Sequence, residues 1–107
     1  MTDPKQIQES VLTRLTAVID PETNVDVVTM GLIPQLDVDA DGLVRYKFRP
    51  SSPICPIAVF LALNIIHAIF EVEGVSSQEI TVTDYMQADA LNQLLKEEIA
   101  RLVLSRT

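Results

Sequence analysis

Residues 50–70 decide the fold and read Pro-Ser-Ser-Pro-Ile-Cys-Pro-Ile-Ala-Val-Phe-Leu-Ala-Leu-Asn-Ile-Ile-His-Ala-Ile-Phe. Three prolines in the first seven residues hold this loop extended and stiff, because each ring fixes its own φ. The remainder predicts a helix from about Pro56 to Phe70 that is apolar nearly all round, as is typical of a central buried helix. We expect it to pack on a sheet and on something else, such as a second subunit. Its least apolar stripe consists of Pro56, Phe60, Asn64, His67 and Glu71.

Alternating apolar residues on either side of this helix predict three strands. Within residues 32–38, Leu36 and Val38 alternate with polar neighbours, and Pro34 makes the strand start late or lie at an edge. The second strand runs from Leu43 to Arg49, and the intervening Asp41-Gly42 predicts a turn. The two strands therefore form an antiparallel hairpin, in which Val44, Tyr46 and Phe48 face one way and Arg45, Lys47 and Arg49 face the other. The third strand, around residues 79–83, follows the helix-closing Gly74.

Two further helices are expected near the ends of the chain. The first has Asp3 as N-cap and Pro4 at its first position, and it ends at Asp20 because Pro21 follows. The last begins between Asp84 and Asp89, where Asp84 and Gln87 can form a capping box. The fold class is α+β: a single domain over residues 1–107, in two layers, with a small mixed sheet covered by helices. Its element order is helix-strand-strand-helix-strand-helix.

Composition excludes several classes of function. The chain has 107 residues, 48% of them apolar, and such a length can bury about 65% of its surface. A net charge of −7 disfavours partners such as nucleic acid or an anionic membrane. No signal peptide is visible, and the apolar run of residues 54–63 is too short to span a bilayer. We therefore expect a soluble cytoplasmic protein.

Cys55 is the single cysteine, so an intramolecular disulfide and a cysteine-only metal cage within one chain are both impossible. It is expected at the start of the central helix, where free N–H groups and the helix dipole favour a thiolate. A thiolate binds metal or attacks electrophiles. The alternative is an inert buried cysteine that serves as a small hydrophobe.

The other polar candidates also have two interpretations. Ser51 and Ser52 can donate to a thiolate or sulfide, or they can satisfy a turn, which we favour. Asp20, Glu22 and Asp26 can hold a hard cation, but Asx-turn chemistry in a solvated loop is favoured. Asp20 is the exception, because a carboxylate at a helix C-terminus is unfavourable and hints at a partner. His67 lies about three turns beyond Cys55 on the same helix, so it forms no dyad with it and is expected at a surface or interface.

Two segments together resemble a known family. Asp20-Pro21-Glu22, Val25-Asp26-Val27-Val28 and Met30-Gly31-Leu32-Ile33 resemble the first signature of PaaD/SufT-type iron–sulfur cluster assembly domains. The run Ser51-Ser52-Pro53-Ile54-Cys55-Pro56 resembles the second, and Gly74-Val75 with the strand after it resembles a weaker third. The chain lacks the cysteine-rich tail of the phenylacetate-pathway members, and it carries Ile54 where relatives often have a small residue.

The resemblance implies a non-enzymatic role in maturing iron–sulfur proteins, with Cys55 as the functional thiol. Asp20 and Glu22 fall on its acidic signature, and Ser51 or Ser52 on its hydroxyl position. Because a two-iron two-sulfur cluster takes four ligands, two chains would share it through their Cys55 residues, as a homodimer. Asp20, Glu22, a small thiol or an apo client protein would complete the ligand set. Partners would be assembly proteins and clients.

Two alternatives remain at this point. One is a metal-free adaptor that links assembly machinery to client proteins and in which Cys55 is structural. The other is a thiol enzyme, such as a persulfide carrier.

Overall fold

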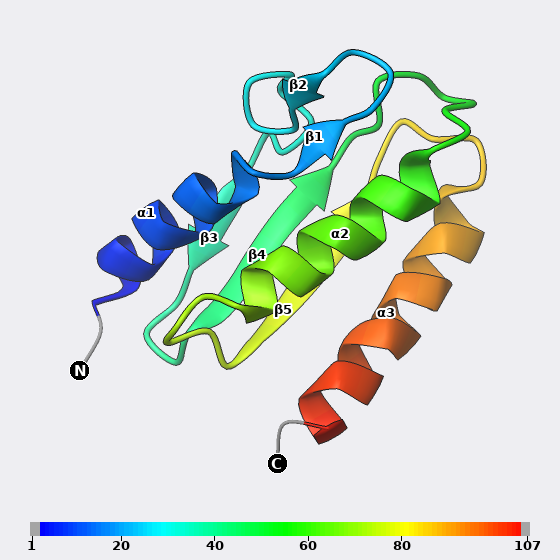
Figure 1. The fold of residues 1–107 in the computed structure, drawn as a ribbon. Helices are drawn as coiled ribbons and strands as arrows, with labels where there is room; N and C mark the ends of the chain where they lie inside the picture. Colours follow the sequence, from blue (N-terminus) through cyan, green and yellow to red (C-terminus); the bar gives the residue numbers. More distant parts are fainter. Residues whose placement is uncertain (1–2, 106–107) are drawn as a thin grey trace.

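A computed structural model describes residues 3–105, which form three helices and five strands in two sheets (Figure 1). The sheet order is β3-β4-β5 in the larger sheet and β1-β2 in the smaller. In chain order the elements are α1 Pro4–Leu15, β1 Ile19–Asp20, β2 Val25–Asp26, β3 Leu36–Val38, β4 Leu43–Phe48, α2 Ala58–Phe70, β5 Ser77–Val82 and α3 Ala88–Ser105.

The larger sheet is mixed, as the sequence predicts. β3 and β4 form the expected antiparallel hairpin, with Leu36 opposite Tyr46. β5 runs parallel to β4, with Ile80 opposite Tyr46. The hairpin turn requires Gly42, which has φ +83, and a Cβ there would collide with the carbonyl oxygen of Gly74.

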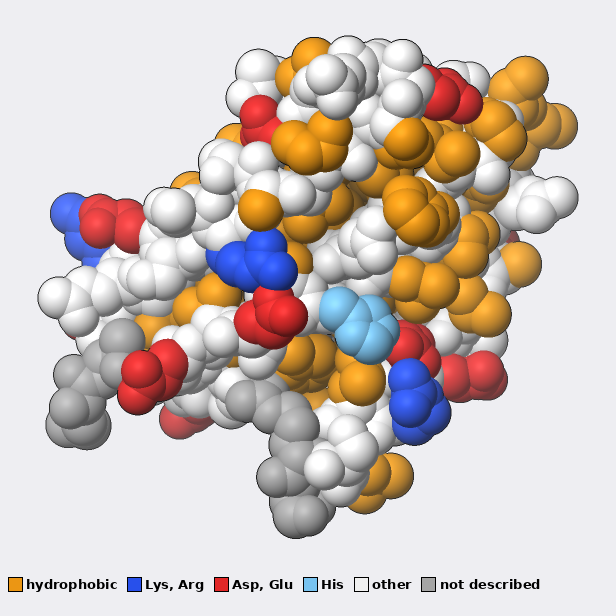
Figure 2. All heavy atoms as spheres, viewed as in Figure 1, with side chains coloured by type: hydrophobic (Ala, Val, Ile, Leu, Met, Phe, Trp, Pro, Cys, Tyr) orange, Lys and Arg blue, Asp and Glu red, His pale blue; other side chains and the backbone are white. Residues whose placement is uncertain are grey.

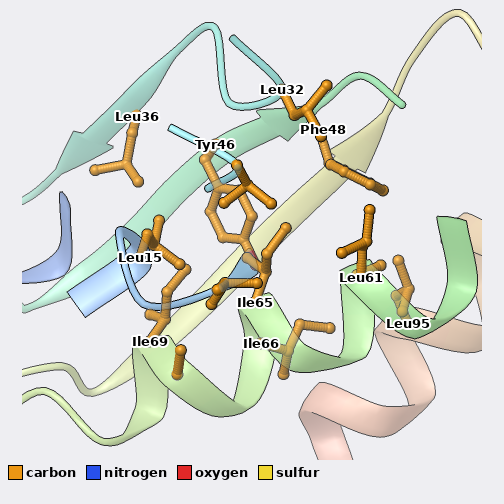
Figure 3. Close-up of a cluster of buried hydrophobic side chains, with 14 of the residues drawn as sticks. Leu15, Leu32, Leu36, Tyr46, Phe48, Leu61, Ile65, Ile66, Ile69 and Leu95 are labelled. Carbon is orange, nitrogen blue, oxygen red and sulfur yellow. The ribbon is translucent and has the colours of Figure 1, made fainter. Parts of the chain in front are cut away.

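The three helices cover one face of this sheet, with α2 between α1 and α3 (Figure 1). The alternation in β4 is confirmed: Val44, Tyr46 and Phe48 are buried, whereas Arg45 and Lys47 are exposed on the other face. Figure 3 shows the inward side chains of β4 meeting those of α2, such as Leu61, Ile65 and Ile69, with Leu15 and Leu95 beside them. The α+β, two-layer prediction is therefore confirmed.

The expected stripe on α2 is exposed along its whole length, from Pro56 to Glu71. The elements that cover the rest of this helix are α1, α3 and the sheet of the same chain. Hydrophobic side chains nevertheless gather on the surface over the first half of α2 and the loop before it (Figure 2). Among them Ile54 and Phe60 are exposed.

The first helix ends earlier than predicted. α1 stops at Leu15 with Thr16 as C-cap, and the chain then turns twice and enters β1, which pairs with β2. The β-branched Val18 and Ile19 favour the extended backbone over a further helical turn. Asp20 is therefore a strand residue, and the argument from an unfavourable helix terminus is wrong. The loop expected to carry Asp20, Glu22 and Asp26 instead connects and includes the strands of the small β1-β2 sheet.

The starts of the other two helices also differ from prediction. α2 begins at Ala58 with Ile57 as N-cap, because the turn that holds Cys55 and Pro56 comes before the first helical hydrogen bonds. α3 begins at Ala88, and Asp84 instead has a left-handed φ of 54, so the capping box is wrong. Among residues 3–105, no helix has both the length and the apolar character needed to cross a membrane.

Candidate functional site

Three loops meet at one end of the molecule, beyond the carboxyl ends of the parallel strands β4 and β5 (Figure 1). They enclose a pocket of about 400 Å³ lined by residues 30–32, residues 49–53 and Asp84. Ligand sites of sheets with parallel strands lie characteristically at such strand ends. The pocket brings together the end of the first predicted signature and the start of the second, which are far apart in the chain.

Backbone hydrogen bonds tie these loops to one another. The N–H of Arg49 donates to the carbonyl oxygen of Leu32 at 2.8 Å, which joins the first signature to the residue two positions before the second. The N–H of Met86 donates to the carbonyl oxygen of Pro53, also at 2.8 Å. Each side of the pocket is thus held by the main chain, so its shape does not depend on side-chain rotamers alone.

Cys55 is not among the residues that line this pocket, and it is only 4% exposed. Its N–H donates to the carbonyl oxygen of Ser52 at 3.2 Å, and its own carbonyl oxygen accepts the hydroxyl hydrogen of Tyr85 at 3.3 Å. Because it precedes the N-cap Ile57 and packs in the core, the prediction that it starts the helix is wrong. The argument for a thiolate from the helix dipole does not apply to it.

The two serines line the pocket but differ in their surroundings. Ser51 is exposed, whereas Ser52 is half-buried and its Oγ accepts the N–H of Ile54 at 3.2 Å. This contact is the turn chemistry that the sequence favoured. It uses Ser52 as an acceptor, so the hydroxyl hydrogen is still available to a ligand.

The acidic residues of the first signature have structural contacts. Asp20 is 1% exposed, and its Oδ1 accepts the N–H of Glu22 at 2.8 Å, an Asx-turn contact at the start of the β1–β2 connection. Glu22 itself is exposed. Hydrogen bonds from Thr29, first its side chain and then its backbone N–H, lower the pKa of Asp26. Neither Asp20 nor Glu22 lines the pocket.

A resident metal or cluster does not fit the donor atoms that this chain assembles. Over residues 3–105, no three His, Cys, Asp or Glu side chains come close enough to hold a metal ion together. Cys55, Asp20 and Glu22 therefore do not form a ligand set within one chain. His67 is exposed on α2, as expected, and its Nε2 lies 3.0 Å from Glu98 on α3.

Arg49, Asp84 and Tyr85 belong to this end of the molecule and were missed by the sequence analysis. Arg49 and Asp84 line the pocket, and Tyr85 holds the Cys55 loop. One signal could have found them. Arg49 is the last residue of the predicted second strand, Asp84 and Tyr85 come just after the predicted third strand, and the ends of parallel strands lie side by side.

The fold and site thus define a small α+β domain with a polar pocket where its two sequence signatures meet. A family model described as "Iron-sulfur cluster assembly protein" matches residues 8–82, more than half of the chain. The chain belongs to this iron–sulfur cluster assembly family, which confirms the resemblance found in the sequence. The match ends with β5, so α3 lies outside it.

Two relatives match this chain along most of their own length. An uncharacterized protein of Methanocaldococcus jannaschii is 35% identical over 91 residues, which cover 85% of this chain and 96% of that protein. The "Fe-S protein maturation auxiliary factor" of Porphyromonas gingivalis is 33% identical over 96 residues, covering 83% of this chain and 91% of that protein.

A longer relative matches only in part. The "Iron-sulfur cluster carrier protein" of Deinococcus radiodurans is 28% identical over 69% of this chain, and the match covers 21% of that protein. Among solved structures, a domain of unknown function from Bacillus anthracis superimposes with a TM-score of 0.69 at 22% identity, covering 91% of this chain and 94% of that one. This likeness supports the fold alone.

Proposed function

We propose that this chain is a non-enzymatic auxiliary factor of iron–sulfur cluster assembly, working with assembly proteins and apo client proteins. The observation that carries the proposal is the near-complete match to a relative named as a maturation auxiliary factor. The carrier protein supports it less, since most of that protein has no counterpart here. The single free cysteine suits a reducing compartment such as the cytoplasm.

The cluster would be cargo, held only in part by this chain. Cys55 is the one thiol available, and a two-iron two-sulfur cluster takes four ligands. A second copy of the chain, a small thiol or a client would supply the others, because the described residues assemble no three-ligand group. Cys55 would also have to leave its buried position, so the loop of residues 50–57 would open on binding.

Anaerobic reconstitution tests this proposal. Wild type and Cys55→Ala are incubated with iron and sulfide, and bound metal, visible absorption and mass are measured. We expect uptake by the wild type and loss of uptake in the variant, with circular dichroism showing that the variant is folded. Equal uptake by a folded Cys55→Ala would exclude Cys55 as a ligand. A mass of twice the chain in the loaded sample would support the homodimer.

A metal-free adaptor is the second candidate, and the burial of Cys55 beneath exposed apolar side chains favours it. Ile54 is 71% exposed and Met86 78% exposed, on the two loops joined beside Cys55. Exposed apolar patches of this kind mark contact surfaces for other proteins. In this case Cys55→Ser would keep partner binding, whereas Ile54→Ser would lose it.

A thiol enzyme, such as a persulfide carrier, predicts that Cys55 reacts fast with an alkylating agent at neutral pH. The buried position favours slow alkylation, limited by opening of the loop. A rate in the native protein equal to that in urea would support the thiol enzyme.

A further inference from the structure

Two opposite charges line the same pocket without pairing. Arg49 and Asp84 both belong to its wall, yet neither forms an ion pair or a side-chain hydrogen bond within residues 3–105. The other arginines of this part of the chain, Arg14, Arg45 and Arg101, each pair with a carboxylate. In a chain of net charge −7, an arginine without a carboxylate partner is available to a ligand.

The backbone holds Asp84 at the pocket. Its φ of 54 lies in the left-handed region, which an aspartate adopts less readily than glycine. Backbone hydrogen bonds hold the chain before and after Asp84. The N–H of Thr83 donates to the carbonyl oxygen of Phe48, and the N–H of Met86 donates to the carbonyl oxygen of Pro53. The loop therefore keeps this carboxylate beyond the carboxyl end of β5, next to the end of β4 that carries Arg49, and both residues line the same cavity.

The chemistry of the wall matches a ligand with one charge of each sign on adjacent groups. A guanidinium binds a carboxylate with two parallel hydrogen bonds, and the hydroxyls of Ser51 and Ser52 can donate to the same group. A carboxylate such as Asp84 accepts from an ammonium group. A volume of about 400 Å³ lies within the range of small-molecule pockets.

We propose that this pocket binds a free α-amino acid, with its carboxylate at Arg49 and its ammonium group at Asp84. The amino acid we choose is cysteine. This choice rests on the proposed function, because free cysteine would bring a second thiol to the same end of the molecule as Cys55. Binding itself involves no metal and no reaction.

The test is a titration of the metal-free, ¹⁵N-labelled chain with L-cysteine under reducing conditions, followed by amide chemical shifts. We expect shifts confined to residues 30–32, 49–52 and 83–86. N-acetyl-L-cysteine lacks the ammonium group and L-cysteine methyl ester lacks the carboxylate, so both should bind more weakly. Arg49→Gln should weaken L-cysteine binding roughly two- to fivefold, as loss of an exposed ion pair does.

The variants assign each charge to its partner. Arg49→Gln should leave the affinity for the methyl ester unchanged, because that analogue has no carboxylate to bind. Asp84→Asn should leave the affinity for N-acetyl-L-cysteine unchanged, because that analogue has no ammonium group. Asparagine also tolerates the left-handed backbone at position 84. Lys47→Gln is the matched control, because Lys47 lies on the same exposed face of β4 outside this pocket and should have no effect.

The proposal is overturned if L-cysteine causes no local shifts, or if Arg49→Gln binds it as wild type does. Neither result bears on cluster assembly, which the reconstitution with Cys55→Ala tests separately. Conversely, if the chain takes up no cluster in the reconstitution, amino acid binding seen in the titration still supports this proposal.

Discussion

Replacing Tyr46 by phenylalanine removes one hydroxyl from a buried chain of hydrogen bonds that joins both layers of the fold. The Tyr46 hydroxyl donates to Oε1 of Gln78 at 2.6 Å, which connects β4 to β5. Nε2 of Gln78 then donates to the carbonyl oxygen of Ile66 on α2 at 2.9 Å. Burial raises the pKa of Tyr46 well above its usual 10.0, so it remains a neutral donor at any working pH.

The burial of this hydrogen bond sets the expected loss of stability. Both side chains are buried, so Tyr46→Phe leaves Oε1 of Gln78 without a donor and out of reach of water. A buried polar atom left unpaired costs about 1–3 kcal/mol in the free energy of unfolding. For a domain near 100 residues, each 1 kcal/mol lowers Tm by about 4–8 °C. Urea unfolding followed by circular dichroism measures the first quantity and a thermal melt the second.

Two further variants make this prediction refutable. Tyr85→Phe is the matched control, because its hydroxyl is only half-buried and its bond to Cys55 is longer, at 3.3 Å. It should cost less than Tyr46→Phe. Adding Gln78→Met to Tyr46→Phe removes both members of the pair, so the double variant should lose less stability than the sum of the two single changes. Strictly additive losses, or a Tyr46→Phe no worse than Tyr85→Phe, would refute the reasoning.

Three other predictions concern the turn and the attachment of α3. Gly42→Ala should cost at least about 2 kcal/mol in urea unfolding, because the positive φ and the collision with the facing backbone add together; a smaller loss would show that the turn relaxes. Asn92 on α3 binds the backbone of β5 with two hydrogen bonds. Its Oδ1 accepts the N–H of Val82 at 2.7 Å, and its Nδ2 donates to the carbonyl oxygen of the same residue. Asn92→Ala should cost about 1–3 kcal/mol and speed amide exchange in β5, and unchanged exchange would contradict this role. Hydrogen bonds from Arg101, and next from His67, lower the pKa of Glu98 below its usual 4.5. The ionised Glu98 carboxylate therefore contributes fully to the free energy of unfolding above pH 4.5, and this contribution is lost as pH falls through the lowered pKa of the folded state. The unfolding free energies of wild type and Glu98→Gln should therefore converge in acid. A difference between them that stays constant at all pH values would refute this prediction.

Local patterns predicted much of the fold. The alternation of Val44, Tyr46 and Phe48 indicated a strand with one buried face, and burial confirms it. The apolar run after Pro56 predicted the central helix to within two residues at its start. Such signals are readable because side-chain periodicity follows directly from the geometry of helix and strand.

Predictions that depended on element boundaries were less successful. The end of α1 was placed at Asp20 on the strength of the following proline, but β pairing with residues 25–26 ends the helix earlier. The position of Cys55 was wrong for a similar reason, since a turn stands between it and the first residue of α2. In the first case strand pairing acts together with the β propensity of Val18 and Ile19, and in the second a turn precedes the helix.

The sequence by itself determined the two-layer α+β class, the hairpin, the buried helix and the two signatures that identify the family. Only the tertiary structure decided that β5 pairs parallel to β4, and hence that Arg49 and Asp84 face one pocket. It also decided that Cys55 is buried while Ile54 beside it is exposed. The physical reason is distance along the chain: periodicity is a property of neighbouring residues, whereas the pairing of β4 with β5 joins residues more than thirty positions apart.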